Sequence, residues 1–248
     1  LDYLGVPAAM TADGPAGLRI PPDRGIKTTA WPASTLLACT WDPKVIFRVG
    51  EAAAKEVREN NIGMWLAPAI NIHRNPLCAR NFEYYSEDPL VAGELASAMV
   101  QGIQSQLVSA CVKHFCCNNK ESYRDISDSR VSERALREIY LKAFEIVVKH
   151  GGVWSIMTSY NLLNGVYTSE NEELLTGILR EEWGYDGLVI TDWWNRGEHY
   201  REALAGNNVR MPNGRPKRLQ KAMELGLITR KELLTNAKQV LNWLLKLN

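Results

Sequence analysis

Short runs of β-forming residues alternate with helical stretches along nearly the whole chain, and this alternation restricts the possible folds more than any other feature. The runs that favour strands are 5–12, 28–34, 64–70, 109–115, 153–159, 187–193 and 207–211. Strands that are joined through helices pair in parallel. Seven such strands in 248 residues predict an α/β fold, a (β/α)8 TIM-like barrel whose N-terminal edge can be incomplete. An open doubly wound sheet is the alternative, although the chain lacks the glycine-rich motifs of its nucleotide-binding members.

Several helices have recognisable starts. At 42–43 and 88–89 an aspartate precedes a proline, which suits an N-cap followed by the first helical position. Ser169 and Thr229 each stand three residues before a glutamate, the spacing of a capping box. The last helix, 230–247, carries a stripe of leucines, so we expect it to pack against the body of the protein.

Composition narrows the class of protein. One domain over 1–248 is the simplest organisation, because a chain with 46% hydrophobic residues can bury one sizeable core. Lys and Arg number 29 against 28 Asp and Glu, which gives no electrostatic footprint for nucleic acid or an anionic membrane, and no run is long enough to span a bilayer. The five cysteines lack paired spacing, and the histidines share no ligand spacing with acids or thiols. We therefore expect no disulfide framework, no metal and a cytoplasmic location, with upstream sequence preceding the abrupt first strand.

Polar side chains gather where the predicted strands end. Asp13 follows strand 5–12, Lys113 and His114 close strand 109–115, Tyr160 follows strand 153–159, and Asp192 closes strand 187–193. The carboxyl ends of parallel strands share one face of a barrel, which is where active sites of this fold are assembled. The sequence therefore predicts one pocket that these residues line together.

Each of these residues also has a simpler interpretation. Asp192 alone suits an N-cap or a turn, but Trp193 and Trp194 directly after it favour a site where a sugar ring stacks on an aromatic platform. Lys113 can belong to a salt bridge in a loop, although burying its ammonium requires an anionic partner or a ligand. Core packing remains the simpler interpretation for Trp194 and for Met157.

Five long segments, in order along the chain, resemble motifs of the family 3 glycoside hydrolases, in particular their β-glucosidase branch. The segments are TADGPAGLR (11–19), LAPAINIHRNPLCARNFEYYSEDP (66–89), KHFCCNNKESYR (113–124), MTSYNLLNG (157–165) and VITDWW (189–194). The resemblance extends over about 4–247, and motifs of this length are specific. It implies a barrel domain, 1–248, of an enzyme that hydrolyses O-glycosyl bonds without a cofactor.

The resemblance also implies a role for individual residues. The catalytic nucleophile of the family falls on Asp192, which would form a covalent glycosyl-enzyme in a retaining mechanism. The residues that would hold the sugar are Asp13, Arg19, Arg80, Lys113, His114, Arg124, Met157, Tyr160 and Trp193. Small β-glucosides or oligosaccharides are the expected partners, and xylosides stay open as an alternative.

Two departures from the family concern the general acid. In the β-glucosidase branch a glutamate of an α/β sandwich domain acts as acid and base, and this sequence contains no such domain. In another branch a histidine on the loop after the lysine–histidine pair takes part, but the corresponding loop, 116–129, contains no histidine. Asn208 also replaces an aspartate that is common in the family. The sequence therefore predicts a retaining, exo-acting β-glucosidase or its nucleophile-bearing barrel, with a carbohydrate-binding scaffold as the alternative.

Overall fold

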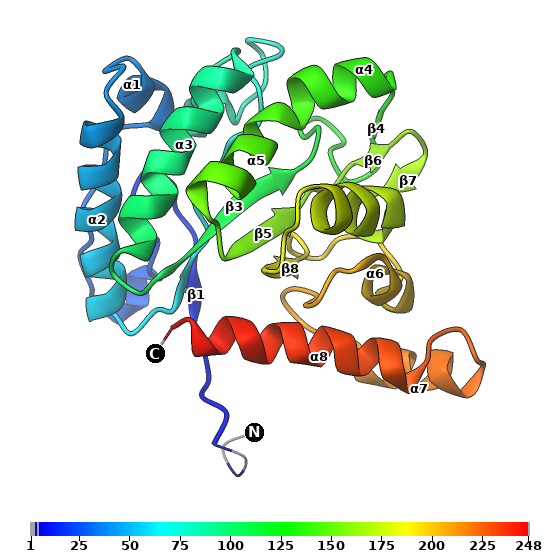
Figure 1. Ribbon diagram of the computed structural model, residues 1–248. Helices are drawn as coiled ribbons and strands as arrows, with labels where there is room; N and C mark the ends of the chain where they lie inside the picture. Colours follow the sequence, from blue (N-terminus) through cyan, green and yellow to red (C-terminus); the bar gives the residue numbers. More distant parts are fainter. Residues whose placement is uncertain (1–2, 4, 248) are drawn as a thin grey trace.

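The computed structural model describes Tyr3 and residues 5–247, and these residues form parallel strands with helices packed around them (Figure 1). The elements are β1 (Thr11–Ala12), η2 (Pro22–Arg24), α1 (Ser34–Ala38), α2 (Pro43–Glu59), β2 (Met64–Trp65), η3 (Asn81–Glu83), α3 (Pro89–Gln104), β3 (Ser109–Phe115), β4 (Asp128–Ser129), α4 (Glu133–Ala135), η4 (Leu136–Tyr140), α5 (Lys142–Ile146), η5 (Val147–Gly151), β5 (Ser155–Thr158), β6 (Leu162–Leu163), β7 (Val166–Tyr167), η6 (Thr168–Glu170), η7 (Glu173–Glu182), β8 (Leu188–Ile190), α6 (His199–Ala205), α7 (Pro216–Glu224) and α8 (Arg230–Leu245).

The main sheet is parallel throughout, with the strand order β1-β2-β3-β5-β8. A parallel bridge between Ile190 and Val209 continues it into the predicted strand 207–211. Strands β4, β6 and β7 form a small separate sheet. The α/β architecture of the (β/α)8 type is the one that the alternating sequence predicts.

One predicted strand is wrong. Residues 28–34 run outside both sheets, and helix α1 begins at Ser34. Isolated hydrogen bonds hold the segment in place of a β-ladder. The backbone N–H of Trp31 donates to the carbonyl of Ala16, and the backbone N–H of Thr29 donates to the Glu56 carboxylate. Pro32, which has no N–H, also prevents a continuous ladder there. The predicted strand 5–12 is confirmed only at Thr11–Ala12.

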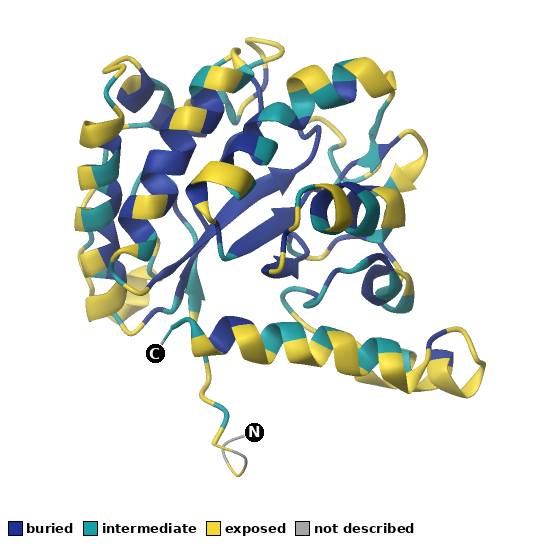
Figure 2. Cartoon of the chain, in the orientation of Figure 1, coloured by how far each residue is buried: buried dark blue, intermediate teal, exposed yellow. Residues whose placement is uncertain are grey.

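Helices cover the outer face of the sheet, where α2, α3 and α5 lie side by side (Figure 1). Apolar side chains of these helices pack against outward-facing strand residues such as Val112, Ile156 and Val189. Strands β2, β3, β5 and β8 are buried on both faces and β1 is half-buried, whereas the outer surfaces of the helices are exposed (Figure 2). This burial on both sides explains the near-continuous apolar runs in the sequence.

The inner face of the sheet contacts the end of α8. Met64, Cys111, Met157 and Ile190 form one apolar cluster with Trp243. The indole Nε1–H of Trp243 donates to Ser109 Oγ over 2.9 Å, which satisfies the only polar atom of that buried ring.

The expectation for the last helix is only partly confirmed. Its Thr229 capping box forms, but Leu234, Leu241 and Leu245 are exposed, so most of the leucine stripe does not pack on the sheet. A stripe shows which face of a helix is apolar, whereas its burial depends on how much of the helix the sheet can cover.

The helix N-caps that the sequence predicts are confirmed, with one exception. The carboxylates of Asp42 and Asp88 accept hydrogen bonds from the first turns of α2 and α3, as predicted. The Ser169 capping box is wrong, because Ser169 lies within η6 and points toward Glu202. Asn171 Oδ1 instead accepts the hydrogen bond at the start of η7.

Within the described part of the chain, no helix has the length and apolar character that a membrane crossing requires.

Candidate active site

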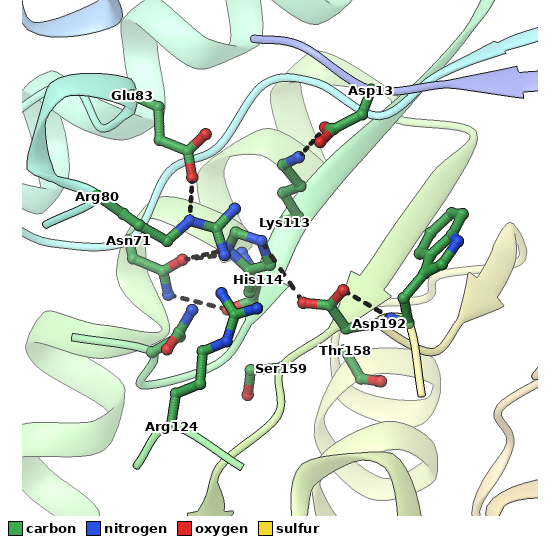
Figure 3. A network of polar contacts seen from close by, with 12 residues as sticks. Asp13, Asn71, Arg80, Glu83, Lys113, His114, Arg124, Thr158, Ser159 and Asp192 are labelled. Atoms are coloured by element: carbon green, nitrogen blue, oxygen red, sulfur yellow. Dashed lines mark hydrogen bonds and ion pairs between the residues drawn. The ribbon is translucent and has the colours of Figure 1, made fainter. Parts of the chain in front are cut away.

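A cavity of about 570 Å³ lies at the carboxyl ends of the strands, and it lies within the size range of small-molecule sites. Side chains from β1, β3, β5 and β8 or the loops after them converge on it (Figure 3). All ten residues that the sequence predicts for the site line this cavity: Asp13, Arg19, Arg80, Lys113, His114, Arg124, Met157, Tyr160, Asp192 and Trp193. Strand polarity predicted Asp13, Lys113, His114, Tyr160 and Asp192, and the resemblance to the family implied the others.

An ion pair joins the ends of β1 and β3. The Nζ atom of Lys113 lies 2.5 Å from Asp13 Oδ1, and the Lys113 side chain is almost fully buried. Arg19 Nη1 approaches the other oxygen of Asp13 at 3.3 Å from the exposed side. Burial raises the pKa of Asp13, but the charges and hydrogen bonds of Lys113, with help from Gly14 and Arg19, outweigh it and hold the pKa below its usual value. Asp13 is therefore a carboxylate acceptor at the cavity wall.

Lys113 and His114 are consecutive, yet both line the cavity. In a regular strand they would point to opposite faces of the sheet. The pairing of β3 with β5 shifts register between Val112 and Phe115, and such an irregularity redirects side chains. The end of β3 therefore supplies two adjacent polar groups to one site.

His114 is held by Asn71 and is neutral. Asn71 Oδ1 accepts from the His114 backbone N–H at 2.8 Å, and Asn71 Nδ2 donates to the His114 carbonyl at 2.9 Å. These two bonds fix the amide orientation, so Nδ1 of the ring, 3.3 Å from the same Oδ1, must be the donor. Burial and the charges of Arg80, Lys113 and Arg124 keep the pKa of His114 well below its usual value.

His114 Nε2 consequently carries a lone pair toward the cavity. It lies 3.8 Å from Asp192 Oδ2, and because the ring is neutral this approach is not an ion pair. Both atoms are hydrogen-bond acceptors, so a hydroxyl group is the kind of ligand donor that fits beside them.

Asp192 is a buried carboxylate of the cavity with one oxygen that lacks a hydrogen-bond partner among the described residues. Its side chain is only 10% exposed. Oδ1 accepts from the Trp193 backbone N–H at 2.7 Å, whereas Oδ2 accepts no well-formed hydrogen bond from any described residue. Burial raises the pKa of Asp192 above its usual value, although the Trp193 N–H, Lys113, Arg80 and the Tyr160 hydroxyl oppose the rise. Oδ2 therefore has lone pairs available in a buried position of the cavity, beside the cations that line it.

Two arginines stand opposite Asp192, and each is anchored by a glutamate. Arg80 Nε lies 2.5 Å from Glu83 Oε1, and Arg124 Nη1 lies 2.8 Å from Glu121 Oε2. The Arg124 guanidinium also stacks 4.4 Å from the ring centroid of Tyr160. These contacts fix the direction of both planar cations.

The sequence did not point to several further cavity residues or supports, among them Asn71, Phe82, Glu83 and Glu121. Trp194 is 75% exposed at the cavity wall, so of the two interpretations left open for it, core packing does not hold. A signal existed for Glu83, which stands three residues after Arg80, the spacing of an ion pair on a helical turn. Asn71 gave no such signal, because its partner is 43 residues away.

Asn208 lies outside the cavity. Its Oδ1 accepts from the Val189 backbone N–H at 2.8 Å and from Arg180 at 3.1 Å. The replacement of aspartate at this position therefore leaves the carboxylates of the cavity unchanged.

Across the described ranges, no group of three or more His, Cys, Asp and Glu side chains is arranged to hold a metal ion.

Comparison with known proteins decides the family. The sequence pattern described as the glycosyl hydrolase family 3 N terminal domain matches residues 2–243. The chain belongs to glycosyl hydrolase family 3. The resemblance inferred from the motifs is thereby confirmed.

Relatives and solved structures in this family are longer than the chain. This chain is 57% identical to β-glucosidase A of Butyrivibrio fibrisolvens, and the match covers 94% of this chain and 28% of that protein. It is 44% identical to an exo-α-(1→6)-L-arabinopyranosidase of Bifidobacterium longum, over 84% of this chain and 29% of the relative. It is 47% identical to β-glucosidase 3B from Thermotoga neapolitana in complex with glucose, with a TM-score of 0.95, over 99% of this chain and 36% of the other.

Proposed function

We propose that this chain is the nucleophile-bearing part of a retaining, exo-acting β-glucosidase. The observation that carries the proposal is Asp192, a buried carboxylate with one unpaired oxygen, at the end of β8 and facing a cavity lined by cations. A carboxylate nucleophile needs accessible lone pairs and must remain ionised. Lys113 and Arg80 supply the nearby positive charge that favours the ionised form.

The other cavity residues suit a hexopyranose. A sugar presents several hydroxyls, each of which donates and accepts, so it requires convergent donors and acceptors. Asp13 and His114 Nε2 offer acceptors, while Lys113, Arg80 and Arg124 offer charged donors. We propose that Trp193, with Tyr160 and Met157, forms the apolar wall against which the ring lies.

The proposed reaction has two steps. An oxygen of Asp192 attacks the anomeric carbon and forms an ester bond, while the bond to the leaving oxygen breaks and that oxygen takes both electrons and a proton. Water then attacks the same carbon, loses a proton to a base and releases Asp192 as a carboxylate. Two inversions at one carbon give net retention of configuration.

The acid that protonates the leaving oxygen is proposed to come from outside this chain. The remaining carboxylates that line the cavity are Asp13, Glu83 and Glu121, and each is bound to a cation of the same cavity. An acid must carry a proton before it can give one, and the pKa of Asp13 is held below its usual value. Glu83 and Glu121 instead hold the guanidinium groups of Arg80 and Arg124 in place. An α/β sandwich domain with a suitable glutamate fits the greater length of the relatives.

Glucosides are the substrates that we propose first. The glucose complex of the Thermotoga neapolitana enzyme supports this choice, since that structure and this chain agree closely. The Bifidobacterium longum relative shows that an arabinopyranoside is a substrate of a similar chain. Xylosides and arabinopyranosides therefore belong in the same assay.

Leaving-group dependence tests the proposal. General-acid catalysis contributes about 10²–10⁴-fold for a sugar leaving group, whereas a dinitrophenolate leaves without protonation. The chain assayed alone should hydrolyse dinitrophenyl β-glucoside slowly and cellobiose negligibly. Azide needs no general base, so it should accelerate turnover and yield β-glucosyl azide. Asp192→Asn should abolish all of these reactions, while Lys55→Met, in an exposed ion pair, should leave them unchanged.

Two results would contradict the proposal in different ways. Efficient cellobiose hydrolysis by the isolated chain would mean that an acid within it, such as Glu121, performs the protonation. No reaction with either substrate, together with retained binding of glucose, would favour a carbohydrate-binding scaffold.

A further inference from the structure

A buried ion pair lies beside the cavity but does not line it. Arg210 Nη1 is 2.6 Å from Glu202 Oε1, and the two side chains are 2% and 1% exposed. Arg210 follows Val209, the residue that extends the sheet beyond β8, and Glu202 lies in α6. The space between a strand and its covering helix is normally filled by apolar side chains. Two charges there need an explanation that the proposed chemistry does not give.

The Arg210 guanidinium holds the loop that follows Asp192. Its Nη1 also donates to the carbonyl of Gly197 at 2.6 Å, and its Nη2 donates to the carbonyl of Asn195 at 2.8 Å. Asn195 Oδ1 in turn accepts from the Gly197 backbone N–H at 2.8 Å, which closes a tight turn. The loop is therefore tied to Arg210 at two positions, three and five residues beyond Asp192.

Gly197 shows how closely the loop approaches the pair. A Cβ atom on this residue would lie 2.5 Å from Glu202 Oε1 and 2.9 Å from Ser169 Oγ. Such distances are far inside van der Waals contact, so a larger residue would displace either the loop or the glutamate.

The backbone around Asp192 is fixed on its other side as well. Thr191 N–H donates to the Val209 carbonyl at 3.0 Å, and the Met211 N–H donates to Thr191 Oγ1 at 2.9 Å. The Trp194 N–H donates to the Met211 carbonyl at 3.3 Å. Segments 191–197 and 209–211 thus form one hydrogen-bonded unit with Asp192 between its attachments.

We propose that Arg210 and Glu202 are positioning residues that fix the direction of the Asp192 carboxylate. A buried ion pair contributes little net stability, because the attraction mainly offsets the desolvation of both charges. The pair instead fixes the orientation of the loop after Asp192, since the rigid Arg210 guanidinium binds two loop carbonyls and one carboxylate at once. A nucleophile displaced by about 1 Å can lose about 10²-fold in rate. The catalytic consequence rests on the function proposed above for Asp192.

The test removes both charges together. Arg210→Met alone would leave Glu202 buried without a partner and would destabilise the fold. The double variant Glu202→Gln, Arg210→Met keeps the volume without a buried charge. Its matched control is Arg218→Met, since the Arg218–Glu198 pair joins the same types of side chain at 3.4 Å, and Arg218 is 58% exposed.

The first measurement is inactivation by a dinitrophenyl 2-deoxy-2-fluoro-β-glucoside, which traps the glycosyl-enzyme. The double variant should lose about 10–100-fold in the rate constant of inactivation. The dissociation constant of the reagent should change less than about threefold, because the residues that line the cavity are retained. A defect that is only structural would lower the folded fraction and leave the rate constant of the folded fraction unchanged.

The second measurement is amide hydrogen exchange, which does not depend on catalysis. Residues 192–198 should exchange faster in the folded double variant, while β3 should exchange as in the wild type. Unchanged exchange in 192–198, or an unchanged rate constant of inactivation, would overturn the proposal. If the wild type were not inactivated at all, the proposed function would fail, and exchange alone would decide whether the pair fixes the loop.

Discussion

Asp192→Asn should make the folded protein more stable at neutral pH while it removes the nucleophile. The substitution keeps the shape of the side chain and the acceptor for the Trp193 N–H. It replaces the unpaired Oδ2 by an amide group whose N–H faces His114 Nε2, a lone pair 3.8 Å from the present oxygen. A buried carboxylate with one unsatisfied oxygen is thus exchanged for a neutral group with an acceptor nearby.

The size of the effect follows from two opposing contributions. An unsatisfied buried polar group costs about 1–3 kcal/mol, and more when it is charged. The substitution also forfeits the attraction that Lys113 and Arg80 exert on the carboxylate. We therefore expect a net gain in the free energy of unfolding of about 1–2 kcal/mol, near the lower end of that range.

The gain should depend on pH with a defined sign. Burial raises the pKa of Asp192 above 3.8 in the folded state, so the folded protein binds this proton more tightly than the unfolded chain. The wild type therefore loses stability as pH rises through the folded pKa, and the asparagine variant does not. The difference should be full at neutral pH and should shrink as the pH falls toward 3.8.

Urea unfolding of both proteins at several pH values measures this difference directly. Asp186→Asn is a suitable control, because Asp186 is 88% exposed and meets Lys246 only at 3.7 Å. A destabilised Asp192→Asn variant at neutral pH, or a gain that does not vary with pH, would refute the assignment of an unsatisfied, buried carboxylate at this position.

Three further predictions concern the cavity and the inner face of the sheet. Lys113→Met should raise the KM for glucosides at least tenfold and lower the free energy of unfolding by about 1–3 kcal/mol, while Lys55→Met should change neither. Asp13→Asn should lower the free energy of unfolding at neutral pH, and this difference should shrink as the pH falls below 3.8, because the pKa of Asp13 is lowered in the folded state. A difference that stays the same at low pH would contradict this. Trp243→Phe should cost about 1–2 kcal/mol in urea unfolding, since Ser109 loses its indole donor, and an unchanged midpoint would exclude that contact.

The residues of the cavity could be predicted because they depend on strand polarity and on motifs that are local in sequence. Asp13, Lys113 and Asp192 each follow a run that is readable as a strand, and parallel pairing places those ends together. The N-cap at Asp42 was equally readable, since its carboxylate accepts from the backbone N–H of Lys44, only two residues along the chain.

Features that depend on distant partners could not be predicted in this way. Nothing near His114 in the sequence identifies Asn71 as the residue that fixes its tautomer. Arg210 looks like a surface residue until the structure places Glu202 and the loop carbonyls around it. The exposure of Trp194 follows from a left-handed backbone conformation at φ +55°, which an apolar pattern does not indicate.

The position of the trapped sugar identifies the nucleophile. The chain would be incubated with the dinitrophenyl 2-deoxy-2-fluoro-β-glucoside, digested and analysed by mass spectrometry. We predict one adduct, on Asp192, that is absent from Asp192→Asn and present in Lys55→Met. An adduct on Glu83, Glu121 or Asp186 of a folded, reactive protein would contradict the assignment of Asp192 as the nucleophile.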